Sequence, residues 1–163
     1  MKIRVEQLGL VINNTPILKG VSFTVPHGSF VSLVGPNGAG KSSILRVIAK
    51  DIDGHSGTVT DVRQGELTYL PQGLMPPPFL STIDVVKLGF YGQSLTDHEK
   101  FTESNRLLET CGIQDIRSHP FVDISAGEKQ RAWLAFALAQ AKELILMDEP
   151  LAAIDIPARR SFF

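Results

Sequence analysis

A short glycine-rich segment carries residue types that could hold a chain of phosphates. Residues 35–42 read Gly-Pro-Asn-Gly-Ala-Gly-Lys-Ser and match the pattern G-x-x-x-x-G-K-[ST] at every fixed position. Glycines let the backbone curl so that successive N–H groups face phosphate oxygens. Lys41 is a compact cation that can reach the outer phosphates, and the Ser42 hydroxyl can ligate Mg²⁺. The alternative is a plain glycine-rich turn. The segment lies between a predicted strand and a predicted helix, however, and this favours a nucleotide site.

A pair of acids near the end of the sequence could complete such a site. Residues 144–147 are apolar, and Asp148 and Glu149 follow them. In a parallel sheet, this buried strand would deliver Asp148 to its carboxyl end, beside the phosphate loop. Asp148 could then hold Mg²⁺, and Glu149 could orient or deprotonate an attacking water. An isolated match would equally suit an edge strand that ends in solvated acids, but the phosphate loop upstream favours the chemical role.

A third segment predicts the start of a helix. Residues 124–131 read Ile-Ser-Ala-Gly-Glu-Lys-Gln-Arg. Ser125 can be the N-cap, and Glu128 three residues later completes a capping box. The free N–H groups and the positive end of the helix dipole would form a second anion site. On local grounds alone, the segment could simply be a well-capped helix.

The elements that must position these residues indicate an α/β core interrupted by helices. Apolar patterns predict strands at residues 3–12, 21–25, 30–34, 67–70 and 143–147. Helical spacing covers residues 42–49, 83–111 and 128–142. Because strands lie towards both ends and helices fill the middle, we expect a helical insertion between about residues 73 and 140.

Composition excludes several classes of protein. The 163 residues suit one domain. A net charge of −1 argues against an indiscriminate binder of nucleic acid or of anionic membranes. The longest apolar run, 132–139, is too short to span a membrane, and the first residues do not resemble a secretion signal.

The single Cys111 cannot form an intrachain disulfide, and we expect it to be buried. The four histidines have no metal-ligand spacing and are expected on surfaces or loops.

In their order along the chain, these segments resemble the motifs of ATP-binding cassette (ABC) proteins. Residues 124–131 resemble the signature motif of that family, usually Leu-Ser-Gly-Gly-Gln. Gln72, after Tyr-Leu-Pro, resembles the Q-loop glutamine, and residues 151–155 resemble the D-loop. Residues 17–23 resemble the stretch ahead of the phosphate loop. The resemblance covers essentially the whole chain.

The resemblance implies the fold. It is an α/β P-loop NTPase cassette with an N-terminal antiparallel β part and a helical subdomain. Residues 1–72 and 141–163 would form the core, and residues 73–140 the helical subdomain. The family's switch histidine lies beyond the D-loop, and no histidine of this sequence matches it. We therefore expect a cassette that lacks its C-terminal strands.

The resemblance also implies ATP and Mg²⁺ as ligands. Gln72 would sense the metal and the water, and Glu149 would be the catalytic base. Ile12 stands where the family often has an aromatic residue that stacks on adenine. The metal ligands would be Ser42, Gln72 and Asp148. The phosphates would be held by Gly35, Pro36, Asn37, Gly38, Ala39, Gly40, Lys41, Ser42 and Ser43.

The signature motif implies a head-to-tail homodimer. Its residues would meet the γ-phosphate of ATP bound to the opposite subunit, and closing the dimer would itself be the catalytic step. Two signature positions depart from the pattern: Ala126 replaces the first glycine, and Glu128 replaces glutamine. The dimer-side residues would be Ser125, Ala126, Gly127, Glu128 and Asp155.

Residues 84–92 and 119–125 look most like importer ATPases for iron-siderophore, haem, cobalamin or zinc/manganese uptake. Membrane permease subunits would dock near residues 72–91, and the chain would lie in the cytoplasm on the inner face of the membrane. Residues 76–79, Pro-Pro-Pro-Phe, could belong to that docking surface or could only stiffen the start of the helical insertion.

Two other readings stay open. One is a non-transport ABC ATPase that acts on ribosomes or nucleic acid. Such proteins usually carry tandem cassettes or long basic inserts, which this sequence lacks, so no nucleic-acid partner is expected. The other is a truncated cassette that binds ATP without efficient turnover, since the switch histidine has no counterpart.

Overall fold

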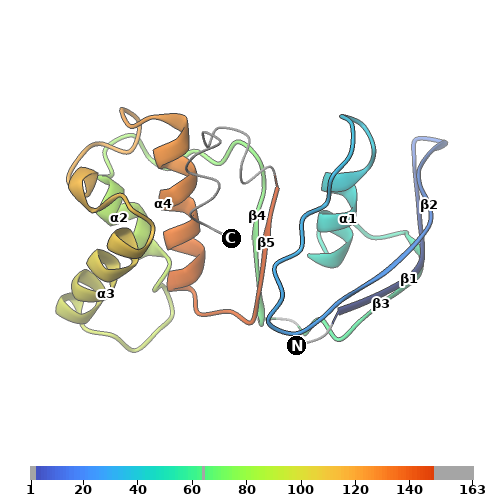
Figure 1. Ribbon diagram of the computed structural model, residues 1–163, viewed down its shortest axis with the longest axis horizontal. Helices are drawn as coiled ribbons and strands as arrows, with labels where there is room; N and C mark the ends of the chain where they lie inside the picture. Colours follow the sequence, from blue (N-terminus) through green and yellow to red (C-terminus); the bar gives the residue numbers. More distant parts are fainter. Residues whose placement is uncertain (1–2, 64, 149–163) are drawn as a thin grey trace. The chain divides into compact units, whose positions relative to one another are not determined.

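The computed structural model describes residues 3–63 and 65–148, which form two units (Figure 1). Residues 3–69 and 143–148 make up the first unit, and residues 70–142 make up the second. The phosphate loop and Asp148 belong to the first unit, while Gln72 and the signature segment belong to the second.

A three-stranded antiparallel sheet in the order β2-β1-β3 forms one side of the first unit. Its strands are β1 (Ile3–Ile12), β2 (Thr15–Val25) and β3 (Ser56–Thr60). The inward residues of β1 switch phase between Val5 and Leu8, which strict alternation does not allow. A β-bulge lies between these two residues, with Gln7 at φ 49°, and it returns Leu8 to the buried face.

Helix α1 (Lys41–Ile48) buries one face in the core of the first unit. Ile44, Val47 and Ile48 have helical spacing and are all buried. Two further strands, β4 (Leu67–Leu70) and β5 (Leu144–Met147), are hydrogen-bonded to each other. Figure 1 shows them running in the same direction, with α1 between them and the three-stranded sheet. Leu146 of β5 joins the same core as α1 and β1.

The strand predicted at residues 30–34 is wrong. This segment has no strand assignment, and the side chains of Phe30, Val31 and Val34 are 66%, 49% and 91% exposed. Leu33 alone in this run packs against the core. An apolar run is buried as a strand only where neighbouring strands and a covering layer are present. Among the described residues, 30–34 belong to neither sheet.

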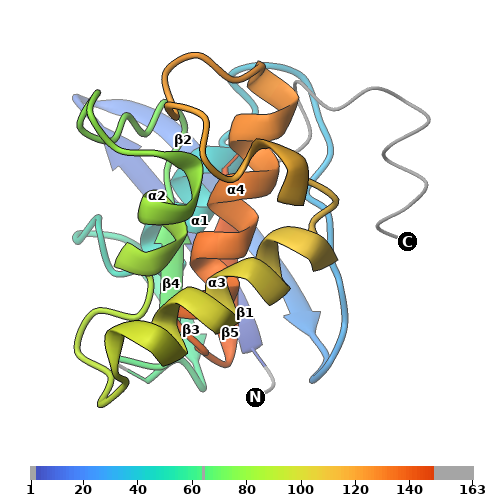
Figure 2. The ribbon, with the colours of Figure 1, turned by 90° about the vertical axis from the view of Figure 1, so that its left-hand side faces the viewer.

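Three helices and a short 3₁₀ turn build the second unit (Figure 2). They are α2 (Thr82–Leu88), α3 (Asp97–Thr110), η1 (Gln114–Ile116) and α4 (Ala126–Ala139). The three α-helices pack pairwise on one another. Gly89, the C-cap of α2, permits close packing on α4, because a Cβ there would lie 2.7 Å from the Cβ of Ala139. Cys111 is buried in the apolar core of this unit, as expected.

None of the helices in the described part of the chain has the length and apolar character needed to cross a membrane.

Candidate functional site

The phosphate loop leads from residues 30–34, which have no strand assignment, to the start of α1. Gly38 and Gly40 have φ angles of 81° and 86°, in the left-handed region that favours glycine. The N–H of Ala39 donates to the Pro36 carbonyl at 3.2 Å and closes the turn, and α1 begins at Lys41. The loop therefore ends at a helix N-terminus, whose free N–H groups and positive dipole end attract anions.

The Lys41 ammonium folds back over this loop. Its Nζ donates to the carbonyl oxygens of Gly35 at 3.0 Å and Pro36 at 2.9 Å. Both acceptors are neutral. A phosphate oxygen at the loop would compete for the same ammonium, because a charged acceptor forms the stronger hydrogen bond.

A hydrogen bond joins the start of α1 to the end of β5. The Ser42 hydroxyl donates to Asp148 Oδ1 at 3.0 Å. As expected from the strand that carries it, Asp148 lies beside the phosphate loop. A hydroxyl and a carboxylate are hard oxygen ligands of the kind that Mg²⁺ prefers, so the pair fits a magnesium ion shared with nucleotide phosphates. Within the described ranges, no three His, Cys, Asp or Glu side chains gather into a separate metal site.

Tyr69 is a residue near this pair that no sequence pattern singled out. It lies on β4 and is partly buried in the core of the first unit. Burial raises the pKa of its hydroxyl, and the charge of Asp148 raises it further. The neutral phenol thus lies within electrostatic reach of the carboxylate. The signal that could have found it is its position on a strand that pairs with the one carrying Asp148.

The predicted capping box at the start of α4 is confirmed. Ser125 is the N-cap: the Glu128 N–H donates to the Ser125 hydroxyl oxygen at 3.3 Å. In return, Glu128 Oε2 accepts from the Ser125 N–H at 2.8 Å and from its hydroxyl at 2.7 Å. These hydrogen bonds lower the pKa of Glu128. Within residues 3–63 and 65–148, no backbone hydrogen bond is found for the N–H groups of Ala126 and Gly127, and Ala126 is exposed. This end of α4 can therefore receive an anion.

Four further predicted residues are Gln72, Ile12, Glu149 and Asp155, and the structure describes the first two of them. Gln72 is exposed in the loop after β4, and Ile12 ends β1 with 39% of its surface exposed. Glu149 and Asp155 lie outside the described residues. The structure thus brings the phosphate loop and Asp148 together within the first unit, and it builds the start of α4 within the second.

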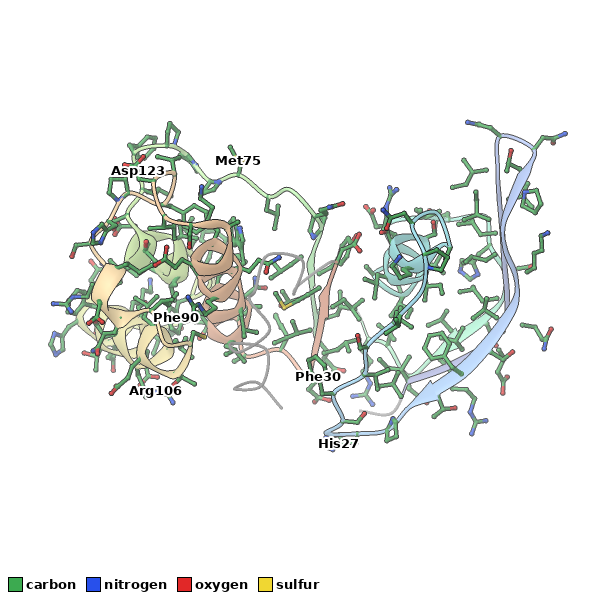
Figure 3. All side chains as sticks on the ribbon, turned by 45° about the horizontal axis from the view of Figure 1, so that its top comes forward. His27, Phe30, Met75, Phe90, Arg106 and Asp123 are labelled. Atoms are coloured by element: carbon green, nitrogen blue, oxygen red, sulfur yellow. The ribbon has the colours of Figure 1, made fainter. Side chains whose placement is uncertain are left out.

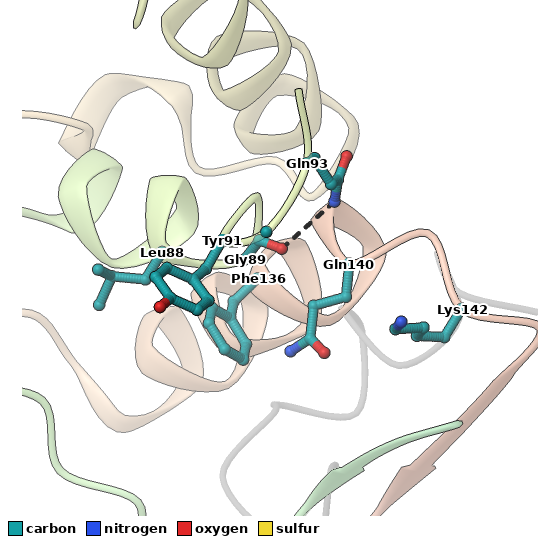
Figure 4. Close-up of a pocket in the computed structure, with 8 residues that line it drawn as sticks. Leu88, Gly89, Tyr91, Gln93, Phe136, Gln140 and Lys142 are labelled. Carbon is teal, nitrogen blue, oxygen red and sulfur yellow. Dashed lines mark hydrogen bonds between the residues drawn. The ribbon is translucent and has the colours of Figure 1, made fainter. Parts of the chain in front are cut away.

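Large apolar side chains are exposed on the second unit. Those around α2 lie in the loop before the helix, at its last residue and in the turn after it, and they are Met75, Phe79, Leu88 and Tyr91. Figure 3 shows Met75 on the loop. Beside Leu88 and Tyr91 there is a hollow of about 330 Å³, which Phe136 and Gln140 also line (Figure 4).

Several known proteins are similar to this chain in sequence. A zinc import ATP-binding protein, ZnuC, from Wolbachia of Brugia malayi is 30% identical over 99% of this chain and 65% of its own length. A Thermotoga maritima protein named "Probable metal transport system ATP-binding protein" is 37% identical over 99% of this chain and 66% of its own length. The chain thus spans about 65% of the length of these relatives.

A solved metal-chelate type ABC transporter in an inward-facing conformation shares the fold. Its TM-score is 0.80 at 24% identity, over 98% of this chain and 65% of the other. The sequence model described as "ABC transporter" matches residues 18–152, a range that contains the phosphate loop, the Ser125 cap and Asp148. Since that match covers most of the sequence and the fold agrees with it, the chain belongs to the ABC transporter family.

Proposed function

We propose that this chain binds Mg-ATP and is the ATP-hydrolysing part of an importer. The observation that carries the proposal is the Ser42–Asp148 hydrogen bond, which holds two Mg²⁺-type ligands at the N-terminus of the helix that begins with Lys41. Phosphate loop, ammonium, hydroxyl and carboxylate then converge on one place in the first unit.

Each residue has a separate task in this proposal. Lys41 leaves the carbonyls of its own loop and binds the outer phosphates. Ser42 and Asp148 would hold Mg²⁺, and the ion would supply charge neutralisation on the phosphates. Glu149 accepts a proton from the attacking water. Positioning and charge stabilisation dominate phosphoryl transfer, so no covalent intermediate with the protein is needed.

The open end of α4 supports a head-to-tail homodimer. Its Ala126 and Gly127 N–H groups suit the γ-phosphate of ATP bound to the partner, and the Ser125–Glu128 box holds them in place. Asp155 is proposed to act at the same interface. Hydrolysis then depends on dimer closure.

The exposed apolar side chains support docking of membrane permease subunits near residues 72–91. Met75, Phe79 and Tyr91 are at least 80% exposed, and exposed apolar clusters mark interaction surfaces. The names of the relatives favour import of zinc, another metal or a metal chelate, with the ATPase on the cytoplasmic face of the membrane. The chain by itself is expected to bind ATP and hydrolyse it weakly.

Nucleotide titration by calorimetry tests the proposal. Wild type should bind ATP in the presence of Mg²⁺. Lys41→Ala should weaken binding at least about tenfold, as expected for the loss of a charge-assisted contact. Lys19→Ala is the matched control, because Lys19 is exposed on β2 and outside the loop. Equal affinities for the two variants would refute the site.

A further inference from the structure

We propose that Thr82 positions the start of α4. It does so by fastening the segment 117–121, which leads into that helix, to the N-terminus of α2. The contact of α4 with phosphate rests on the proposed function, whereas the positioning itself does not.

Thr82 makes two hydrogen bonds to one carbonyl. Its N–H donates to the His119 oxygen at 2.9 Å, and its hydroxyl donates to the same oxygen at 3.2 Å. The next residue, Ile83, donates its N–H to the Arg117 carbonyl at 2.9 Å. These are the first N–H groups of α2, which have no acceptor inside the helix. The lead-in segment supplies the acceptors.

A third backbone bond fixes the other end of the fastening. The Phe121 N–H donates to the Leu80 carbonyl at 2.9 Å, and Ser81 forms a β-bridge with Pro120. The lead-in segment is therefore held on both sides of His119.

Few residues separate this fastening from the cap of α4, and they are themselves constrained. Asp123 donates its N–H to the Pro120 carbonyl at 3.1 Å, and Ile124 is buried. From within α4, Lys129 Nζ donates to the Val122 carbonyl at 2.8 Å. A shift at residues 117–121 must therefore reach Ser125.

The Thr82 side chain is buried where its hydroxyl donates to the His119 carbonyl. Thr82 is fully buried, and Phe121 is 2% exposed and packs edge-on against Trp133 of α4 at 5.3 Å. Valine at position 82 would keep the shape and remove the hydroxyl donor, while the N–H of residue 82 would still donate to the His119 carbonyl. The hydroxyl bond is part-buried, and its loss should cost about the net value of one hydrogen bond.

Hydrogen exchange of individual amides tests the proposal on the full chain without nucleotide. Thr82→Val should accelerate exchange of the Glu128 and Lys129 amides, which donate to Ser125, by about fivefold, the effect of one net hydrogen bond. The buried Leu107 and Leu108 amides of α3 should stay within about twofold, as the internal reference. Thr82→Ser keeps the donor and should restore the wild-type exchange at Glu128 and Lys129.

The matched control is Thr110→Val. Thr110 also donates its hydroxyl to a carbonyl, that of Arg106 at 2.8 Å, but it lies at the end of α3. This variant should leave the Glu128 and Lys129 amides unchanged.

Two results would overturn the proposal. In the first, Thr82→Val accelerates exchange at Ile83 and Phe121 but not at Glu128, so that the fastening is local. In the second, the Leu107 amide accelerates equally, so that Thr82 only stabilises the whole unit. Nucleotide binding by wild type is measured separately, so a failure of the proposed function and a failure of the positioning role are distinguishable.

Discussion

Gly40→Ala should weaken the first unit more than any other glycine substitution in the phosphate loop. Gly40 has a φ of 86°, and a Cβ at this position would lie 2.7 Å from Leu18 Cδ2 and 3.4 Å from the Ile17 carbonyl oxygen. Leu18 is buried in the core on β2 and has little room to withdraw. The substitution therefore meets a backbone penalty and a steric penalty together.

Gly38→Ala separates the two penalties. Gly38 has a similar φ of 81°, but a Cβ there would meet nothing within 4 Å. It should cost about 1–2 kcal/mol of unfolding free energy, the penalty for a left-handed Cβ. Gly40→Ala should add about 1–3 kcal/mol for overpacking, giving about 2–5 kcal/mol in total.

Native-state hydrogen exchange in α1 measures the difference. The amide of Ile48 is buried near the end of this helix and should report its opening free energy. In Gly40→Ala, exchange at Ile48 should be faster than in Gly38→Ala by a factor set by the steric cost. Adding Leu18→Val should shrink the gap, since the two sites contact each other. Equal exchange in the two glycine variants would show that the close approach of Leu18 does not exist.

Three further predictions follow from the structure. Asp148→Asn removes a charged metal ligand, so it should weaken ATP binding in the presence of Mg²⁺ by roughly tenfold or more. ATP binding without Mg²⁺ should weaken far less. Equal losses of affinity with and without Mg²⁺ in calorimetry would contradict the metal role. Burial raises the pKa of Cys111 to about 11, so its thiol should resist alkylation at pH 8 until urea unfolds the chain. Since the folded pKa exceeds the unfolded one, the stability that this thiol contributes should be complete below about pH 9 and lost as the pH rises towards 11. The exposed apolar residues of 30–34 should cause self-association that sedimentation experiments detect. Val34→Lys should reduce this self-association at little cost in stability, because Val34 is 91% exposed. Unchanged self-association in the variant would exclude this segment as the contact surface.

The parts of the site that follow local rules could be predicted from the sequence. The Ser125–Glu128 box depends on two residues three positions apart, and the structure shows both of its hydrogen bonds. The apolar run before Asp148 predicts a strand. The position of Asp148 beside Ser42 follows from the carboxyl end of that strand, which lies next to the phosphate loop.

The features that the sequence did not predict depend on contacts between segments that are distant in sequence. Residues 30–34 have the pattern of a buried strand, but burial depends on which segments lie beside them, and the pattern does not contain that information. In the same way, nothing around Thr82 or Tyr69 indicates contact with His119 or proximity to Asp148. Both relations arise only when segments distant in sequence pack together.

The N-termini of α2 and α4 show what a local sequence pattern does not determine. Helices α2, α3 and α4 all begin with a capping box, at Ser81–Asp84, Thr96–Glu99 and Ser125–Glu128, so the same local signal precedes each of them, and α2 and α4 can be compared directly. At α2, however, the next N–H groups are occupied, because Thr82 and Ile83 donate to the segment that leads into α4. At α4, the corresponding N–H groups of Ala126 and Gly127 have no such acceptor in the part of the chain that the structure describes. A capping box therefore identifies a helix start but not an anion site. The two helix ends differ in whether another segment packs against their first N–H groups. Segment 117–121 supplies acceptors to the N–H groups of α2, and the same segment leads into α4.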